Sequence, residues 1–326
     1  MNRHLIALAF ALLAAAAPVF AQDGRTAWPA KPVRVIVPFP PGGGAEAAAR
    51  FLANDFMQAF GQSFIIDNRP GGNTVIGAEA AAKAAPDGYT LLVTGGSTMS
   101  IQPLVFAGKL PYDPLNDFAP VTMVSHFPFF LLVPASLQVN TLGELVAYVK
   151  ARPGQLAYAS NGSGTMAHLG MEMLKQATGM DLLHIPYKGF GPAVPDLLSG
   201  RVGVMMADLA PVGQQVRAGS LRALAATSAQ RSSFLPDVPT VAELGNPGYE
   251  IDVWFGLFAP AKTPPEIVAK LNAEAVKYLA SPAAKETYGK VGHETITSTP
   301  EAVRNRIATE QREFAKAVRD ARLKPE

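Results

Sequence analysis

The sequence predicts an α/β fold divided between two domains. Short apolar runs rich in β-branched residues alternate with amphipathic stretches, which is the pattern of βαβ units built around a parallel sheet. The chain has 326 residues, and domains of ~100–200 residues predict two of them. After the N-terminal segment, no internal repeat or low-complexity tract interrupts this alternation.

Nine short apolar runs are predicted to form strands, and helices fill most of the intervals between them. In chain order the predicted strands are 33–39, 64–67, 90–94, 129–133, 156–159, 182–186, 202–207, 221–227 and 253–259. The stretch 110–121 contains prolines and has neither helical nor strand periodicity, so we expect it to be a crossover between the domains. A second crossover is predicted near 217–224.

Three helices carry start signals in the sequence. Thr141 and Glu144 form a predicted capping box, in which the threonine oxygen accepts from the third helical N–H and the glutamate accepts from the threonine N–H. Thr263 and Glu266 have the same spacing, with proline at the first helical position. Thr299 opens the last predicted helix in the same way. These are structural elements, and no chemistry is inferred from them.

The N-terminus has the order of a secretory signal peptide. A short basic start precedes the apolar stretch 5–17, and Val19 and Ala21 supply the small residues of a cleavage site. This predicts a signal peptide over 1–21, a mature chain from Gln22 and export to the periplasm. The apolar stretch is too short to cross a bilayer, which needs ~20 residues. A buried N-terminal helix is the alternative.

Composition excludes several classes of function. Without the predicted signal peptide the chain has 27 basic and 26 acidic side chains, a balance that indicates neither nucleic acid nor an anionic membrane surface as a partner. The absence of cysteine excludes disulfides, cysteine metal sites and thiol nucleophiles. The histidines lack metal-ligand spacing. We therefore expect no metal and no cofactor.

The stretch VPFPPGGGAEAAAR at 37–50 follows a predicted strand and opens a helix, as anion-binding loops do. The run from Gly42 to Ala47 also fits the dinucleotide fingerprint G-x-G-x-x-A, with Asp67 placed as a ribose-binding acid. Three prolines beside the glycines make a stiffer turn than that fingerprint uses, which weighs against a nucleotide. A plain tight turn is the third interpretation.

Two further loops of similar chemistry follow predicted strands: TGGSTMS at 94–100 and SNGSGTMAH at 160–168. Such loops meet at the carboxyl ends of the strands in open α/β sheets, where ligands bind. None of the three loops contains lysine or arginine. The sequence therefore predicts a carboxylate held by amides and hydroxyls at helix N-termini rather than by an ion pair.

Seven stretches together resemble the Bug-type receptors of the tripartite tricarboxylate transporters, in the same order and over essentially the whole predicted mature chain. They are VRVIVPFPPGGG, FIIDNRPGG, APDGYTLLVTGGS, LPYDPLNDFAPVT, LAYASNGSGT, HIPYKG and LPDVPTVAELG. The resemblance implies a periplasmic solute-binding protein with the type II periplasmic binding protein fold: two lobes, a ligand cleft and two crossovers. It further implies a small organic acid as ligand and a two-component membrane permease as partner. We expect a monomer.

The predicted lobes are 22–120 plus 225–326 for the first and 121–224 for the second. The resemblance places the ligand site on three loops and on Asp208, the acid that ends a second-lobe strand. The predicted contacts are Phe39, Pro40, Pro41, Gly42, Gly43, Gly44, Ala45, Glu46, Ser97, Thr98, Asn161, Ser163, Gly164 and Thr165. Ala45 and Glu46 depart from the usual family pattern of threonine or serine followed by aspartate, which weakens any inference about the ligand from relatives.

His168 lies one turn into the helix behind the third loop and is a further candidate contact, whereas His184 alternates like a structural strand residue. We expect the ligand carboxylate between the 40–45 loop and the 163–165 loop, with Asp208 at the far end; a solvated strand end is the alternative for Asp208. A secreted hydrolase remains the second functional class, although the chain has no G-x-S-x-G elbow and no visible activated nucleophile.

Overall fold

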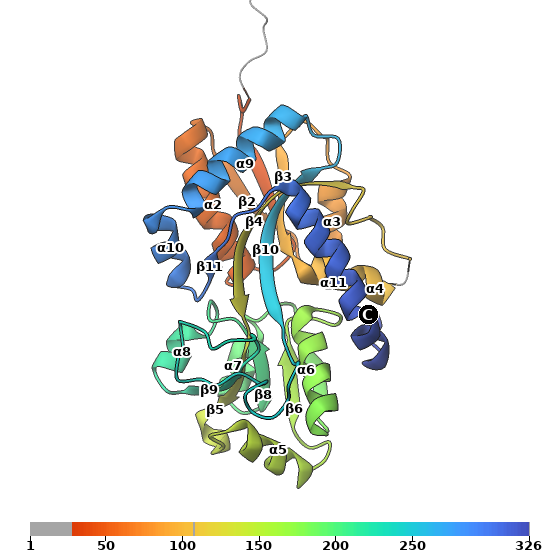
Figure 1. Cartoon of the computed structure of the whole chain (residues 1–326), viewed down its shortest axis with the longest axis vertical. Helices are drawn as coiled ribbons and strands as arrows, with labels where there is room; N and C mark the ends of the chain where they lie inside the picture. The colour runs from red at the N-terminus through yellow and green to blue at the C-terminus, as the bar shows by residue number, and fades with distance from the viewer. Residues whose placement is uncertain (1–27, 107, 326) are drawn as a thin grey trace, which may run out of the picture.

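The computed structural model describes residues 28–106 and 108–325. The predicted signal peptide, 1–21, lies outside these residues. The chain forms two sheets with their own covering helices, stacked along the long axis of the molecule (Figure 1). We call the six-stranded sheet and its helices the first lobe, and the five-stranded sheet and its helices the second lobe.

The first sheet is mixed, whereas the sequence pattern predicted a parallel one. Its strands, in spatial order, are β11 (Glu294–Thr295), β4 (Phe118–Pro128), β10 (Asp252–Pro260), β3 (Thr90–Gly95), β1 (Val33–Val37) and β2 (Phe64–Asn68). β1 is parallel to β2 and β3, but β10 is antiparallel to both β3 and β4. The reason is connectivity: β4 leaves for the second lobe and β10 returns from it, so the two run in opposite directions.

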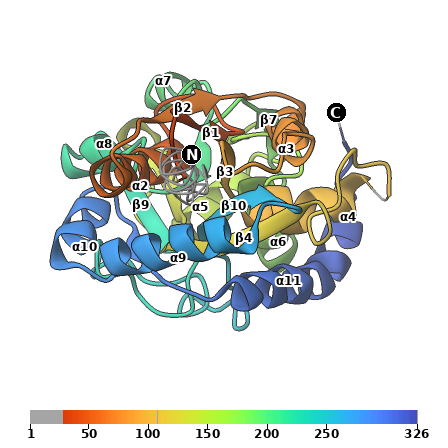
Figure 2. The ribbon, with the colours of Figure 1, turned by 90° about the horizontal axis from the view of Figure 1, so that it is seen from above.

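Helices cover both faces of the first sheet (Figures 1 and 2). On one side lie α2 (Gly44–Phe60), α9 (Pro265–Leu279) and α10 (Pro282–Gly289); on the other lie α3 (Val75–Ala82), η2 (Ser97–Ile101), α4 (Gln102–Phe106) and α11 (Pro300–Asp320). β1 shows the result, because Val35 and Val37 join the core under α2 while Ile36 joins the core under α3. A strand buried on both faces is a nearly continuous apolar run, and in β1 only Arg34 interrupts it.

The second sheet is also mixed. Its strands, in spatial order, are β7 (Leu183–Pro186), β6 (Ala157–Ser160), β8 (Val204–Ala207), β5 (Phe130–Pro134) and β9 (Leu221–Ala226). β6 is parallel to β7 and β8, whereas β5 is antiparallel to β8 and β9. The helices of this lobe are α5 (Leu142–Lys150), α6 (Met166–Thr178), α7 (Ala193–Leu198) and α8 (Gly213–Arg217).

Both passages between the lobes lie further along the chain than predicted. The first is the junction between Pro128 and Phe130, where β4 leads directly into β5, so most of the 110–121 stretch precedes it and its end is already strand. The second is 227–251, after β9, because the predicted crossover at 217–224 belongs to α8 and β9. Consequently 121–128 lies in the first sheet and 225–226 in the second, unlike the predicted lobe boundaries.

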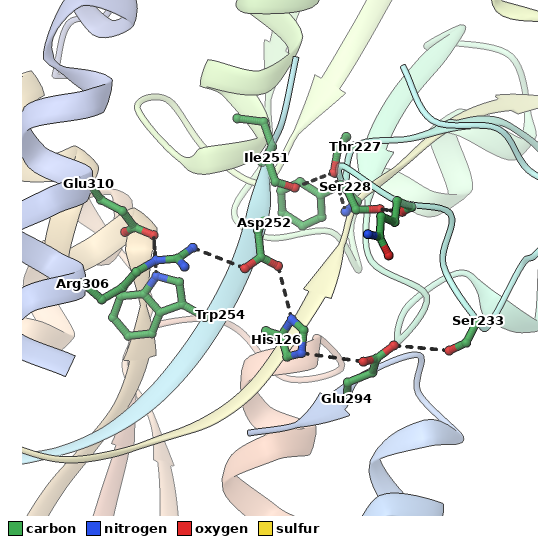
Figure 3. A network of polar contacts seen from close by, with 12 residues as sticks. His126, Thr227, Ser228, Ser233, Ile251, Asp252, Trp254, Glu294, Arg306 and Glu310 are labelled. Atoms are coloured by element: carbon green, nitrogen blue, oxygen red, sulfur yellow. Dashed lines mark hydrogen bonds and ion pairs between the residues drawn. The ribbon is translucent and has the colours of Figure 1, made fainter. Parts of the chain in front are cut away.

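Thr227 ties the two passages together (Figure 3). Its Oγ1 accepts a hydrogen bond from the Phe129 N–H at 2.9 Å and donates one to the Ile251 carbonyl at 2.7 Å. Its backbone N–H donates to the Phe129 carbonyl at 2.9 Å. Three chain segments therefore meet at one buried threonine, at the boundary between the lobes.

The predicted helix starts are confirmed in part. Thr141 and Thr299 each accept from the N–H three residues on. The reciprocal bond of the capping box differs, because Glu144 Oε2 accepts from the Asn140 N–H at 2.7 Å rather than from Thr141. At α9 the predicted cap is wrong: the helix begins at Pro265 and its cap position has no side-chain hydrogen bond.

A buried carboxylate braces the first lobe beneath α11 (Figure 3). Glu310, 2 % exposed, accepts from Ser100 Oγ at 2.7 Å, from Trp254 Nε1 at 2.8 Å and from Arg306 Nε at 2.6 Å. Three donors, one of them charged, offset the cost of burying a carboxylate. The α11 helix is thereby fastened to β10 and to η2.

From Arg306 the polar contacts continue across β10 and β4 to β11 (Figure 3). Arg306 lies 3.3 Å from Asp252, whose other oxygen lies 3.4 Å from His126 Nδ1, and His126 Nε2 lies 3.7 Å from Glu294. The hydrogen bond with Asp252 raises the pKa of His126, although partial burial opposes the shift. Ser233, on the returning passage, donates to Glu294 at 3.2 Å. Through Ser233, the network thus links the returning passage to the first lobe.

Candidate ligand site between the two lobes

A pocket with about 510 Å³ of empty space, its opening included, lies between the two sheets where the chain passes from one lobe to the other. Both lobes contribute to its wall, which consists of side chains and of glycine backbone. The lining residues are Phe39, Pro40, Pro41, Gly43, Gly44, Ala45, Ser97, Phe127, Val253 and Phe255 on the first-lobe side, and Phe129, Asn161, Gly189, Phe190, Gly191 and Asp208 on the second-lobe side.

The structure brings nine of the sequence-predicted contacts together in this pocket. They are Phe39, Pro40, Pro41, Gly43, Gly44, Ala45, Ser97, Asn161 and Asp208. The other predicted contacts lie close behind the wall but do not line it: Gly42, Glu46, Thr98, Ser163, Gly164, Thr165 and His168. Each loop therefore reaches the pocket, although only part of each loop faces it.

The first loop leaves the N-terminus of α2 open toward the pocket. The first N–H groups of any helix lack intrahelical acceptors. The cap residue here is Gly43, which has no side chain to accept from them. Glu46 acts behind the loop: one carboxylate oxygen accepts from the Gly42 N–H at 2.6 Å and the other from Arg50 Nε at 2.6 Å. Glu46 therefore holds the shape of the loop instead of facing a ligand.

In the second loop the two predicted residues take different roles. Ser97 Oγ accepts from the N–H of Met166 in the second lobe at 3.0 Å, which leaves the serine hydrogen available to donate into the pocket. Thr98 is fully buried in a chain of hydroxyls, donating to Thr74 at 2.9 Å and accepting from Thr94 at 2.6 Å. Thr98 thus supports the loop from inside the first lobe.

The third loop is folded on itself, which explains why only Asn161 faces the pocket. Thr165 donates to the Gly162 carbonyl at 2.8 Å, and His168 Nδ1 accepts from the Gly164 N–H at 3.0 Å. Burial, with smaller contributions from His184 and Lys175, lowers the pKa of His168 to about 3. A neutral imidazole can accept this hydrogen bond, so His168 fixes the loop rather than touching a ligand.

Asp208 lies beside Gly44, at the same end of the pocket as the glycine loop. The sequence predicted it at the far end. Its Oδ2 is 3.2 Å from His293 Nε2, and both side chains are at most 2 % exposed. The His293 ring stacks on Phe127 with centroids 4.0 Å apart, and its Nδ1 lies 3.4 Å from Ser125 Oγ. A Cβ on Gly44 would lie 2.2 Å from Asp208 Oδ2, so only glycine permits this approach.

Five phenylalanine rings line the pocket, and sequence reasoning identified only Phe39 among them. The rings form a continuous series with centroid separations of 6.5 Å for Phe39–Phe255, 5.1 Å for Phe255–Phe127, 6.2 Å for Phe127–Phe129 and 5.8 Å for Phe129–Phe190. The aromatic run HFPFF at 126–130 was the available signal, because it spans the junction between the lobes.

The dinucleotide interpretation does not fit the observed surroundings of the glycine loop. Asp67, the proposed ribose-binding acid, forms an ion pair with Arg69 at 2.7 Å and lies 3.9 Å from Arg34. Within 28–106 and 108–325, no group of three or more histidine and carboxylate side chains could hold a metal ion.

A ligand pocket enclosed by two α/β lobes that are joined by two chain passages defines a two-lobe solute-binding protein. The family model described as "Tripartite tricarboxylate transporter family receptor" matches residues 48–322. The chain belongs to this family, whose members are periplasmic solute-binding receptors and not enzymes. The family and the two-lobe α/β fold predicted from the sequence are thereby confirmed, and the hydrolase interpretation has no support.

Relatives match nearly the whole chain, and two of them have solved structures with the same fold. Protein BugT of Bordetella pertussis is 40 % identical over 324 residues, which cover 99 % of each chain. The structure of R. palustris Rpa4515 with adipate is 35 % identical, covers 92 % of this chain and 100 % of its own, and superposes with a TM-score of 0.89. MatC of Rhodopseudomonas palustris with bound malate is 31 % identical, with coverages of 89 % and 100 % and a TM-score of 0.84.

Proposed function

We propose that this protein captures a small organic acid in the pocket between its lobes and delivers it to a two-component membrane permease of the tripartite tricarboxylate type. The acid is held by the pocket residues of the three loops and by Asp208. The protein works as a monomer in the periplasm, after removal of residues 1–21. Within the described part of the chain, no helix combines the length and apolar character needed to cross a bilayer.

The observation that carries this proposal is the open N-terminus of α2 inside an interlobe pocket. Gly43, Gly44 and Ala45 line the pocket, and the helix behind them has 17 residues and no side-chain cap. A helix N-terminus has unpaired N–H groups and about half a positive charge, both suited to a carboxylate. Solved relatives that bind adipate and malate have the same fold, which supports an acid as the ligand class.

Direct hydrogen bonds between the lobes indicate that the structure represents the closed form. Met166 N–H donates to Ser97, and Gln102 Nε2 donates to the Gly164 carbonyl at 3.2 Å. With the Asp208–His293 contact, these bonds surround the pocket on several sides. Two-lobe proteins bind by closing around a ligand about hinge segments, and the Thr227 junction is the natural hinge here.

Native mass spectrometry of protein purified without added ligand tests the proposal first, because it weighs any molecule that the protein retains. A pool of organic acids should then raise the melting temperature, with ~2.7 kcal/mol of stabilisation for a ligand at one hundred times its dissociation constant. Every acid should remain chemically unchanged after overnight incubation. Loss of any acid from the pool, or stabilisation by a nucleotide and by no acid, would contradict the proposal.

A further inference from the structure

We propose that the ligand is an aromatic monocarboxylate, with its ring among the five phenylalanines and its carboxylate at the polar end of the pocket. This inference rests on the proposed function and specifies its substrate class. It is carried by three features of the pocket wall: the aromatic series, the absence of basic side chains and the placement of the hydrogen-bond donors.

The aromatic series forms a wall to which both lobes contribute. Phe39, Phe127 and Phe255 come from the first lobe, whereas Phe129 and Phe190 lie on the second-lobe side. Phe39–Phe255 and Phe129–Phe190 are edge-to-face pairs, and the other two neighbouring pairs are tilted. A planar ring between them would gain offset-stacked and edge contacts that a saturated ring of the same size cannot make.

The charge of the wall favours one carboxylate over two. Among the described residues, no lysine or arginine lines the pocket, and Asp208 is the only acidic residue that does. A second carboxylate at the other end of the ligand would face phenyl rings, and burying a charge without a partner is costly. Lys188 lines a neighbouring cavity toward β7, which shares Phe39, Pro40, Asn161 and Gly189 with this pocket but none of the other four phenylalanines.

The donors for a single carboxylate lie together at the polar end. Ser97 presents a hydroxyl to the pocket, and Asn161 presents a side-chain amide whose Nδ2 is a donor, while its Oδ1 is a buried acceptor without a partner. The N–H groups of Gly44 and Ala45 begin α2 next to them along the wall. These are the kinds of precisely placed polar groups that orient a ligand in an otherwise apolar pocket.

Calorimetry with five ligands tests the proposal. Benzoate should bind at least tenfold tighter than cyclohexanecarboxylate, which has the same size without π faces, and at least thirtyfold tighter than terephthalate, which adds one carboxylate. Glycine betaine tests whether the rings form a cage for a quaternary ammonium group instead. Malate serves as the aliphatic dicarboxylate reference.

Phe190→Leu isolates the aromatic contribution, with Phe51→Leu, which does not line the pocket, as the control. Phe190→Leu should reduce the preference for benzoate over cyclohexanecarboxylate about threefold, while Phe51→Leu leaves the preference unchanged. The inference would be overturned if terephthalate, malate or glycine betaine bound more tightly than benzoate. If the tightest ligand were terephthalate or malate, the proposed function would still stand. Binding of none of these acids would overturn the inference, whereas the proposed function fails only if the pool of organic acids gives no stabilisation either.

Discussion

Gly44 and Asp208 come from different lobes, yet they approach so closely that no side chain fits between them. A Cβ on Gly44 would lie 2.2 Å from Asp208 Oδ2 and 2.8 Å from the His293 ring, and His293 is itself wedged against Phe127. A side chain at Gly44 would have to displace the Asp208 carboxylate, which lies 3.2 Å from His293 Nε2. The absence of one methyl group is therefore a condition for the closed form.

Gly44→Ala should weaken ligand binding at least tenfold by blocking closure. Overpacking a tight site costs ~1–3 kcal/mol, and tenfold corresponds to about 1.4 kcal/mol. Gly43→Ala is the matched control on the same loop, because nothing lies within 4 Å of a Cβ there. Titration calorimetry measures the affinity, and the melting temperature without ligand shows whether each variant is folded. Equal affinities for the two variants would show that closure does not need this approach.

The Asp208–His293 contact should contribute to affinity as a coupled pair, since it joins the lobes only when they are closed. Asp208→Ala, His293→Ala and the double variant form a cycle whose coupling energy we expect to be ~0.5–3 kcal/mol in the free energy of ligand binding. Asp181→Ala, an exposed carboxylate of the same lobe, is the control for loss of charge. Additive effects of the two substitutions would mean that the contact does not support closure.

His168 should make the protein less stable in acid. Its pKa is lowered by burial to about 3, below the ~6.5 of an unfolded chain. Between these values the unfolded chain binds a proton that the folded one does not, so the free energy of unfolding falls as the pH falls below 6.5, by at most ~1.4 kcal/mol per pH unit. Urea denaturation from pH 7 to 4 should show a shallower decline for His168→Gln. Parallel declines would contradict a neutral, buried imidazole.

His126 should act in the opposite direction. The hydrogen bond with Asp252 raises its pKa above 6.5, so its stabilising effect is complete below that pH and is lost as the pH rises through the raised value. His126→Gln should therefore lower the melting temperature more at pH 5.5 than at pH 8.5. If the melting temperature fell equally at both pH values, His126 would stabilise the protein by packing and not by its charge.

Glu310→Gln should destabilise the first lobe. The amide cannot accept hydrogen bonds from Ser100, Trp254 and Arg306 in the same geometry, and it leaves the arginine with Asp252 alone as a carboxylate partner; we expect a loss of ~2–4 kcal/mol. Glu313→Gln, exposed on the same helix, is the control. Equilibrium urea unfolding measures both, and a loss below 0.5 kcal/mol, the usual range for surface changes, would contradict the bracing role.

Much of the fold was predictable because β-branched residues and helix start signals act locally. β1 is apolar at every position except Arg34, and the structure buries it on both faces. β4 was missed because Phe118–Pro128 includes proline at 120 and 128 and polar residues at 122, 125 and 126, which hide strand periodicity. Strand direction was also beyond a local pattern, since β10 is antiparallel only because the chain returns from the second lobe.

The part of the site that lies on loops was predictable, because those loops have a recognisable sequence pattern. Glycines and small hydroxyls after strands located Gly44, Ser97 and Asn161, which the structure brings into one pocket. The phenylalanine wall was missed because Phe127 and Phe255 lie on strands, where an aromatic residue facing a ligand has the same sequence pattern as one in the core. The position of Asp208 depends on how the lobes close, and no local pattern contains that information.

The junction at Thr227 makes the opening of this protein a motion in one dimension. β4 and β10 are hydrogen-bonded neighbours up to the Asp252–Pro128 pair, and Thr227 joins Phe129 to Ile251 just beyond, so both passages leave the first lobe at one point. Two dyes placed on opposite rims of the pocket would then report a single distance. The receptor is thus a ready scaffold for an optical sensor of its own ligand.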